Sequence, residues 1–297
     1  MFPDIKFLTI DLYTWMIIVG VLFAIVAFRI LCDKTQIDAK VFNFALFVCV
    51  VCVVIGYLSA VLFQSWYHYL ATGEWKWGTG ATFYGGLIGA VIGFFAGYFV
   101  IGHFLFKDKK HIAQIDKVVA CAFPCIVLAH SFGRIGCLFA GCCYGLSADP
   151  PFGLKMLVNG EWQYRLPTQL YEAIFLLLLF VALIYLLLKK KCIYTPSVYL
   201  IAYGTWRFVI EYVRDDDERG SSGISWLTPS QLTAIIMIVI GIALIFLYQR
   251  FIKKYLKDLQ KTINSQVAPA EPAAEPSQNG NLIVDKTDDK HQNSQNQ

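Results

Sequence analysis

Charged residues are scarce in this sequence. Asp, Glu, Lys and Arg make up only 15% of its 297 residues, whereas they make up about a quarter of an ordinary soluble domain. The hydrophobic residues, 57% of the chain, gather in long blocks that suit a lipid environment. The lysines flank these blocks and form no exposed basic stripe, so we expect no nucleic-acid partner. The shortage of charge therefore indicates a membrane protein.

The cysteine pattern lacks the marks of a disulfide framework. The count is nine, and most cysteines lie inside apolar blocks. Cys137, Cys142 and Cys143 stand apart because they gather at one loop. Their spacing is not that of paired zinc ligands, no histidine follows within the loop, and the loop has no Cys-x-x-Cys motif. We expect structural thiols or a disulfide there, ahead of a metal or redox role, and we expect no metal and no cofactor.

Seven apolar stretches have about the length of ~20 residues that a helix needs to cross a bilayer. They cover residues 13–31, 41–63, 81–106, 115–137, 169–188, 196–212 and 227–251. The stretch 115–137 contains Arg134, the stretch 196–212 contains Arg207 and Glu211, and such interruptions in a span are often functional. The sequence thus predicts an all-α integral membrane bundle of seven transmembrane helices.

The basic residues predict how this bundle is oriented. Most of them surround the first, third and fifth connections or follow the last span, so the positive-inside rule puts the N-terminus outside and the C-terminus inside. The long connection 138–168 then becomes a small external head on a membrane domain that covers residues 1–262. Residues 263–297 have too few apolar residues to fold, so we expect a disordered cytoplasmic tail.

Polar residues converge at the outer ends of the predicted helices. They are Tyr13, Tyr84, Arg134, Gln169, Glu172, Arg207 and Glu211. A charge inside a span costs about 2.5–3.5 kcal/mol, so the charged groups among them must have a structural or functional role that offsets this cost. One reading is structural, because Arg207 and Glu211 are four residues apart and neutralise each other. The other is a site for an anionic headgroup, since arginine binds phosphate in a bidentate manner, and a phospholipid is the natural ligand at this depth.

Two glycines at the outer mouth also have two readings. Gly85 and Gly86 begin the stretch that continues with Gly89 and further small residues. Small residues at this spacing allow helices to pack closely in a membrane. Exposed backbone N–H groups at Gly85 and Gly86 can also bind an anion.

Four motifs, in order, carry a resemblance to a known family. Residues 133–137 (Gly-Arg-Ile-Gly-Cys), followed by Gly141 and Gly145, resemble the signature loop of the bacterial prolipoprotein diacylglyceryl transferases. Residues 84–89 (Tyr-Gly-Gly-Leu-Ile-Gly), 167–172 (Pro-Thr-Gln-Leu-Tyr-Glu) and 203–212 (Tyr-Gly-Thr-Trp-Arg-Phe-Val-Ile-Glu-Tyr) are similar to its other motifs. Tyr13 matches the tyrosine that opens the family's first span. The resemblance covers roughly residues 10–250.

The resemblance implies a reaction and its partners. A member of this family moves the diacylglyceryl group of phosphatidylglycerol to the lipobox cysteine in the signal peptide of a prolipoprotein, and glycerol phosphate leaves. The protein would then be a multi-pass enzyme of the bacterial plasma membrane with its active site at the outer face. Since a phosphate leaves with growing negative charge, we expect Arg134 and Arg207 to bind and stabilise it and Glu211 to orient Arg207. Gln169 and Glu172 would shape the mouth of the site.

Three departures from the family leave the general base open. Tyr84 stands where many members have histidine, Cys137 and Cys142 stand where many have Asn and Glu, and the usual arginine in the second span is missing. His130, one turn from Arg134, is the nearest substitute base, although a hydrogen-bonded histidine inside the bundle fits equally well. Glu172 and Glu211 are further candidates, and an arginine alone can favour the thiolate.

Two other functions remain as alternatives. The external cysteines fit a membrane thiol oxidoreductase. The same anionic site, without chemistry, fits a transporter or a lipid-binding protein. We find no internal inverted repeat and no charge in the middle of the membrane, and both observations argue against transport.

Overall fold

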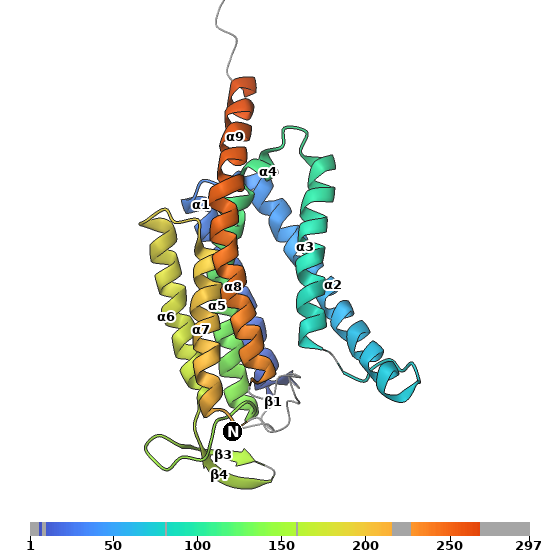
Figure 1. Cartoon of the computed structure of the whole chain (residues 1–297), viewed down its shortest axis with the longest axis vertical. Coiled ribbons are helices and arrows are strands. Elements are labelled where there is room, and N and C mark those ends of the chain that lie inside the picture. Colours follow the sequence, from blue (N-terminus) through green and yellow to red (C-terminus); the bar gives the residue numbers. More distant parts are fainter. Residues whose placement is uncertain (1–5, 8–9, 81, 159, 216–226, 268–297) are drawn as a thin grey trace, which may run out of the picture.

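The computed structural model describes residues 6–7, 10–80, 82–158, 160–215 and 227–267, and most of them are helical (Figure 1). The helices are α1 (Leu12–Lys34), α2 (Ala39–Thr72), α3 (Phe83–Leu105), α4 (Lys110–Ala113), α5 (Ile115–Ala140), α6 (Thr168–Leu188), α7 (Thr195–Ile210), α8 (Pro229–Leu247) and α9 (Lys253–Val267). A 3-10 turn, η1 (Glu211–Val213), follows α7, and a π-helical turn, η2 (Tyr248–Ile252), joins α8 to α9. The long helices run side by side and expose many apolar side chains, which is typical of a membrane bundle.

Six helices are long and apolar enough to cross a membrane, judged by length and composition. They are α1, α2, α3, α5, α6 and the continuous helical stretch Pro229–Ser265. The remaining predicted span, 196–212, corresponds to α7, which has 16 residues. It is therefore shorter than the other six in the part of the chain that the structure describes. Figure 1 places α7 inside the bundle, between α6 and α8.

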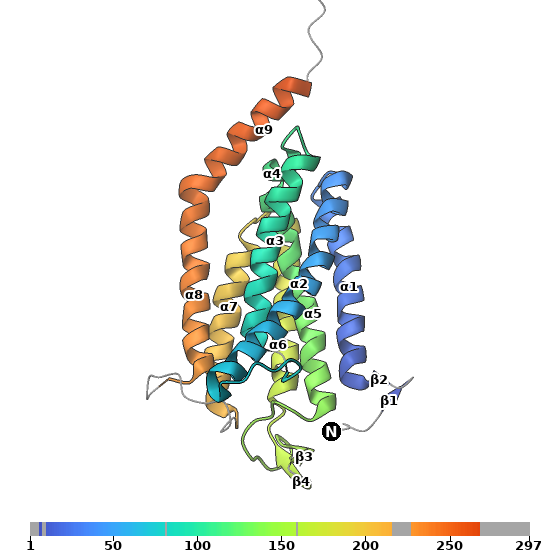
Figure 2. The same cartoon turned by 90° about the vertical axis from the view of Figure 1, so that its right-hand side faces the viewer.

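The structure is mostly helical, as expected for an all-α membrane protein, with a small amount of strand in addition. Two short antiparallel sheets are present, β1 (Lys6–Phe7) with β2 (Ile10–Asp11) and β3 (Leu154–Val158) with β4 (Glu161–Arg165). Strands β3 and β4 form a hairpin within the predicted head, and Figure 2 shows both sheets at the same end of the bundle. The run Glu161–Arg165 alternates side chains between two faces, as a strand requires.

Several helix ends follow from local chemistry. Asp11 caps α1 by accepting a hydrogen bond from the backbone N–H of Thr14 at 3.0 Å. Thr228 and Gln231 form a reciprocal capping box that starts α8. Helix α5 ends at Gly141, whose φ of 71° favours glycine.

Two boundaries lie further along the chain than we predicted. Helix α2 continues to Thr72 rather than ending near residue 63, and Gly73 with a φ of 76° then terminates it. Helix α9 continues to Val267, beyond the boundary at residue 262 that we set between membrane domain and tail. Figure 2 shows α9 leaving the bundle at an angle, at the end opposite the sheets. The rest of the predicted tail, 268–297, lies outside the described residues.

Helix α5 organises the bundle. It packs against α1, α6 and α7, while α7 packs on α8 and α2 packs on α3. A buried apolar cluster that includes Phe28, Val41, Tyr98, Cys121 and Leu187 joins α1, α2, α3, α5 and α6 at one end. Figure 1 shows α2 and α3 diverging from the other helices towards the opposite end, where the sheets lie. The functional side chains are found at that second end.

Candidate active site

A fully buried carboxylate joins three helical segments at the end of the bundle that carries the sheets. Glu172, in the first turns of α6, has no exposed surface. Its Oε1 lies 3.0 Å from Nε of Arg134 on α5 and accepts a hydrogen bond from the Tyr203 hydroxyl on α7 at 2.6 Å. Its Oε2 lies 3.8 Å from Nη1 of Arg214. We expected Glu172 at the mouth of a site, but it is an internal partner of two arginines.

A second ion pair lies at the end of α7. Nη2 of Arg207 is 2.9 Å from Oε2 of Glu211, as the spacing of four residues predicts, and it also donates to the hydroxyl of Ser230 on α8 at 2.7 Å. Glu211 accepts a further hydrogen bond from the Thr228 hydroxyl at 2.8 Å. These contacts hold Arg207 between α7 and the start of α8.

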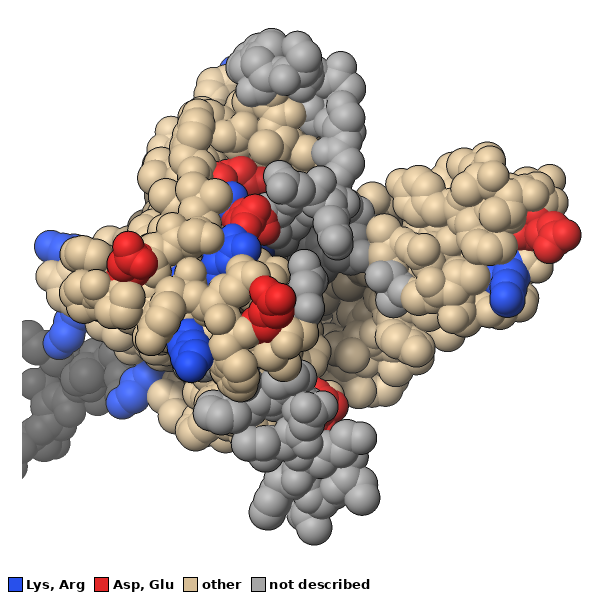
Figure 3. All heavy atoms as spheres, turned by 90° about the horizontal axis from the view of Figure 1, so that it is seen from below, with Lys and Arg blue, Asp and Glu red and all other residues tan. Residues whose placement is uncertain are grey.

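Among the residues that the structure describes, the two ion pairs form one group. Three arginines (134, 207 and 214) gather around two glutamates (172 and 211), and we call this group the arginine cluster. Nη1 of Arg207 is buried and has no hydrogen-bond partner among the described residues. A buried donor without a partner is unfavourable, and an anion would satisfy it. Figure 3 shows acidic and basic side chains gathered on this face of the helical bundle.

Arg214 is a third arginine of this site, and the sequence alone did not single it out. Arg214 is 6% exposed and follows η1 directly. Its backbone forms an antiparallel bridge with Gly145, and a Cβ added at Gly145 would lie 2.5 Å from the carbonyl oxygen of Val213. Only glycine therefore allows the signature loop to fix Arg214 beside Glu172. The only sequence signal for Arg214 was its position three residues after Glu211, and such a spacing is weak evidence for a shared site.

His130 and Tyr13 lie close to the arginine cluster. The ring of His130 is one turn from Arg134 on α5 and packs edge-on against Tyr203, with 5.0 Å between ring centroids. Tyr13 packs on α5 at Gly136, where a Cβ would lie 3.1 Å from its Cδ2 atom. Tyr13 is 38% exposed, so its side chain faces both the bundle and its surroundings. The structure thus brings His130 and Tyr13 to the same level as Arg134.

Gln169 binds the signature loop. Its side-chain amide donates to the carbonyl of Cys142, and the hydroxyl of Thr168 donates to the carbonyl of Cys143 at 2.8 Å. The Sγ atoms of Cys137, Cys142 and Cys143 all lie within 4.8 Å of one another. Hydrogen bonds with the other two thiols, together with the positive charges of nearby arginines, hold the pKa of the Cys143 thiol below its ordinary value.

The structure does not bring Gly85 and Gly86 to the arginine cluster. Both lie where α3 packs on α2, and a Cβ at Gly85 would be 2.6 Å from the Cβ of Phe63. The backbone N–H of Gly86 is used within the helix start, donating to Thr82 at 3.1 Å. These contacts favour close helix packing as the role of both glycines, and binding of an anion by their backbone stays a prediction. The side chain of Tyr84 lies outside the described part of the structure.

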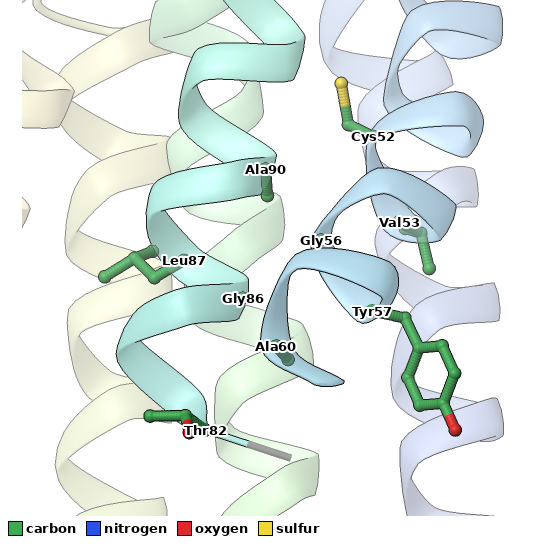
Figure 4. Close-up of a pocket in the computed structure, with 9 residues that line it drawn as sticks. All are labelled: Cys52, Val53, Gly56, Tyr57, Ala60, Thr82, Gly86, Leu87 and Ala90. Carbon is green, nitrogen blue, oxygen red and sulfur yellow. The ribbon is translucent and has the colours of Figure 1, made fainter. Parts of the chain in front are cut away.

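A pocket of about 320 Å³ lies between α2 and α3, away from these charges (Figure 4). Its lining is Cys52, Val53, Gly56, Tyr57, Ala60, Thr82, Gly86, Leu87 and Ala90. None of these side chains carries a charge, so the pocket suits an apolar chain rather than a headgroup. The arginine cluster therefore remains the candidate site.

The family model described as prolipoprotein diacylglyceryl transferase matches residues 1–247. A relative from Clostridium tetani, named phosphatidylglycerol–prolipoprotein diacylglyceryl transferase, is 36% identical over 60% of this chain and 67% of its own length. A relative of the same name from Ehrlichia canis is 32% identical over 63% of this chain and 70% of its own length.

A third relative, from Clostridium perfringens, carries the same name with the number 2. It is 35% identical over 56% of this chain and 62% of its own length. The alignments thus span about two thirds of the curated relatives. The family model matches far more than half of the chain, and its range includes all the residues of the arginine cluster. The chain therefore belongs to the prolipoprotein diacylglyceryl transferase family.

Proposed function

We propose that this chain transfers the diacylglyceryl group of phosphatidylglycerol to the lipobox cysteine of prolipoproteins. The observation that carries the proposal is the buried arginine cluster, in which Nη1 of Arg207 has no hydrogen-bond partner within the described part of a chain of this family. A thiol oxidoreductase or a lipid carrier does not account for the family membership.

The reaction is a displacement at carbon. The cysteine sulfur attacks the glyceryl carbon that carries the phosphate ester, the S–C bond forms, and the C–O bond breaks. The electron pair remains on the phosphate oxygen, so glycerol phosphate leaves with one more negative charge, and the thiol proton passes to a base of the site or to water. Fixed positive groups beside that oxygen stabilise the transition state more than the ground state.

Each charged residue has a proposed role in this displacement. Arg134 and Arg207 bind the phosphate, and Arg214 joins them because it shares the carboxylate of Glu172 with Arg134. Glu172 orients these two arginines, while Glu211 orients Arg207. Such pairing fixes the guanidinium planes before the substrate arrives, which is the preorganisation that electrostatic catalysis requires.

The remaining candidates surround this centre. Tyr13, packed on α5 at the same level, contacts the bound lipid, and Gln169 supports the signature loop. His130 and Tyr84 are candidate proton acceptors. The packing of His130 on Tyr203, whose hydroxyl binds Glu172, connects the imidazole to the arginine cluster.

The topology proposed for the chain has seven spans, an outer N-terminus and an inner C-terminus. Helix α7 and η1 together run from Thr195 to Val213 within the bundle, which supports α7 as the seventh span. The basic residues then lie mostly on the inner side. The protein would be a multi-pass enzyme of the bacterial plasma membrane, with its active site and the head 138–168 at the outer face.

A transfer assay tests the proposal. The purified chain in phosphatidylglycerol vesicles, labelled in the acyl chains, is incubated with a synthetic lipobox peptide, and the label on cysteine is measured. Arg134→Ala and Arg207→Ala should each lower the rate by about 10²-fold or more, because they remove charge at the leaving group. Arg29→Ala is the matched control, since Arg29 also forms an i,i+4 ion pair, with Asp33, but at the opposite end of the bundle. No labelled peptide with the unmodified chain, or full rates in both site variants, would refute the proposal.

A further inference from the structure

Three cysteines of the signature loop place their sulfur atoms beside the arginine cluster. The Sγ atoms of Cys137, Cys142 and Cys143 lie within 4.8 Å of one another. Cys137 is on α5 three residues after Arg134, so the two side chains lie on neighbouring parts of one helix face. Cys142 is exposed, and the other two are half-buried. The cysteine triad is therefore open to a substrate that approaches the arginines.

The local backbone holds the cysteine triad together. The helix ends at Gly141, and the N–H of Cys142 donates back to the carbonyl of Cys137 at 3.2 Å, which turns the loop over the last helical turn. Cys143 has a φ of 62°, a left-handed conformation that residues other than glycine adopt rarely. Hydrogen bonds from Thr168 and Gln169 fix the carbonyls of the adjacent cysteines. A left-handed residue of this kind persists only where its surroundings over-determine it, as at many functional sites.

The size of the triad matches a metal site built from thiolates. Zinc binds cysteine sulfur at about 2.3 Å, so two sulfurs of a tetrahedral site are about 3.8 Å apart. The sulfurs here need to approach one another by no more than about 1 Å to reach that separation. A disulfide would use only two of the three and would require two sulfurs at about 2.05 Å. Three sulfurs gathered at one point therefore suit a cation better than a covalent bridge.

We propose that Cys137, Cys142 and Cys143 bind one Zn²⁺ through three thiolates and leave its fourth position for the thiol of the incoming lipobox cysteine. This rests on the proposed transferase function. Catalytic zinc sites keep three protein ligands and one open position, whereas structural sites are closed by four. A thiol that coordinates zinc loses its proton, which supplies the nucleophile without a general base.

The metal would account for the departures of this chain from the family pattern. Tyr84 occupies the place of a histidine that is a candidate base, and tyrosine, with a pKa near 10, is a poor base at neutral pH. Cys137 and Cys142 occupy the places of Asn and Glu. This sequence lacks the histidine at position 84, and the thiols at positions 137 and 142 would take over its function of activating the substrate thiol.

Opposite charges also favour this arrangement. Three thiolates and one Zn²⁺ give a formal charge of −3 + 2 = −1, next to the guanidinium groups of the arginine cluster. On binding, the lipobox thiol gives its proton to water, and its sulfur then attacks the glyceryl carbon. The C–O bond to phosphate breaks, its electron pair stays on the phosphate oxygen, and the thioether, a weaker ligand than the thiolate, leaves the zinc. No oxidant or reductant is required.

Metal content and coordination test the proposal directly. The full chain is purified in detergent, incubated with equimolar Zn²⁺, desalted, and analysed by mass spectrometry for metal. We expect about one zinc per chain, and about ten-fold less in Cys137→Ser, Cys142→Ser and Cys143→Ser. Cys192→Ser is the matched control, because Cys192 is half-buried but lies at the opposite end of the bundle, between α6 and α7.

X-ray absorption at the zinc edge gives the second readout. The wild-type site should show three sulfurs at about 2.3 Å and one oxygen, and a lipobox peptide should raise the count to four sulfurs. A serine analogue of the peptide should leave three. Absence of bound zinc in the wild-type chain, a disulfide among the three cysteines in peptide mapping, or no fourth sulfur would overturn the proposal.

Transfer measurements separate this proposal from the function on which it rests. Removing zinc with a chelator should lower the transfer rate about 10²-fold or more, and adding Zn²⁺ should restore it. An unchanged rate after complete removal would overturn the catalytic role of zinc. A chain that binds zinc and the peptide thiol but never forms the thioether would support the metal site and refute the transferase function.

Discussion

The buried carboxylate of Glu172 offers the sharpest test of the site, because two arginines depend on it. The substitution Glu172→Gln keeps the size of the side chain and an acceptor for the Tyr203 hydroxyl, which is 2.6 Å away. It removes the negative charge that lies 3.0 Å from Arg134 and 3.8 Å from Arg214. The two guanidinium groups then lose the buried carboxylate that they share.

The magnitude follows from burial. Glu172 is fully buried, and the side chains of Arg134 and Arg214 are 16% and 1% exposed. Breaking a buried ion pair by removing one partner costs about 3–5 kcal/mol. At roughly 2–4 °C per kcal/mol for a chain of this size, the melting temperature in detergent should fall by about 6–20 °C. The transfer rate should fall about 10²-fold, since a misplacement of about 1 Å at a catalytic group has that effect.

Differential scanning fluorimetry and the transfer assay measure the two effects. Glu161→Gln, on the exposed face of the β3–β4 hairpin, is the control and should leave both values unchanged. A Glu172→Gln chain that melts within about 1 °C of the wild type and transfers at the same rate would show that the ion pairs do not organise the site.

Three further predictions follow from the same geometry. Arg214→Gln should lower the transfer rate at least about ten-fold with little change in insertion, and a normal rate in the vesicle assay would remove Arg214 from the site. Gly145→Ala should lower the melting temperature, because the new Cβ meets the carbonyl oxygen of Val213 at 2.5 Å and overpacking of this kind costs about 1–3 kcal/mol. Glycerol phosphate at about 100 times its Kd should stabilise the wild type by about 2.7 kcal/mol. It should not stabilise Arg207→Ala, and equal stabilisation of both would contradict phosphate binding at Arg207.

Much of the fold follows from hydropathy alone, since a run of about 20 apolar residues has few stable states other than a membrane helix. Six of the seven predicted stretches correspond to helices long and apolar enough to span. The predicted ends of the helices were less accurate. Helix α2 runs to Thr72 because amphiphilic residues such as Trp66 and Tyr69 continue it past the apolar block, and hydropathy does not detect that continuation. The β3–β4 hairpin was missed because a strand of five residues in a loop gives only a weak alternation signal.

The sequence by itself determined the family, through motifs in order, and it identified Arg134, Arg207 and Glu211, because ionised groups in apolar runs are conspicuous. It did not determine which arginine forms an ion pair with which glutamate. Arg214 and Glu172 are far apart along the chain, and only the packing of α5, α6 and α7 brings their charges within ion-pair distance.

The same reason applies to the remaining differences. Gly85 and Gly86 lie in the contact between α3 and α2. Composition does not specify which neighbouring helix a given face of α3 packs against, so the sequence alone did not predict this contact. The sequence places Cys137, Cys142 and Cys143 in one loop, but it does not determine whether their sulfur atoms meet. The turn at Gly141 and the left-handed residue Cys143 bring their sulfurs together, because side chains meet in space through backbone geometry that spacing along the chain does not encode.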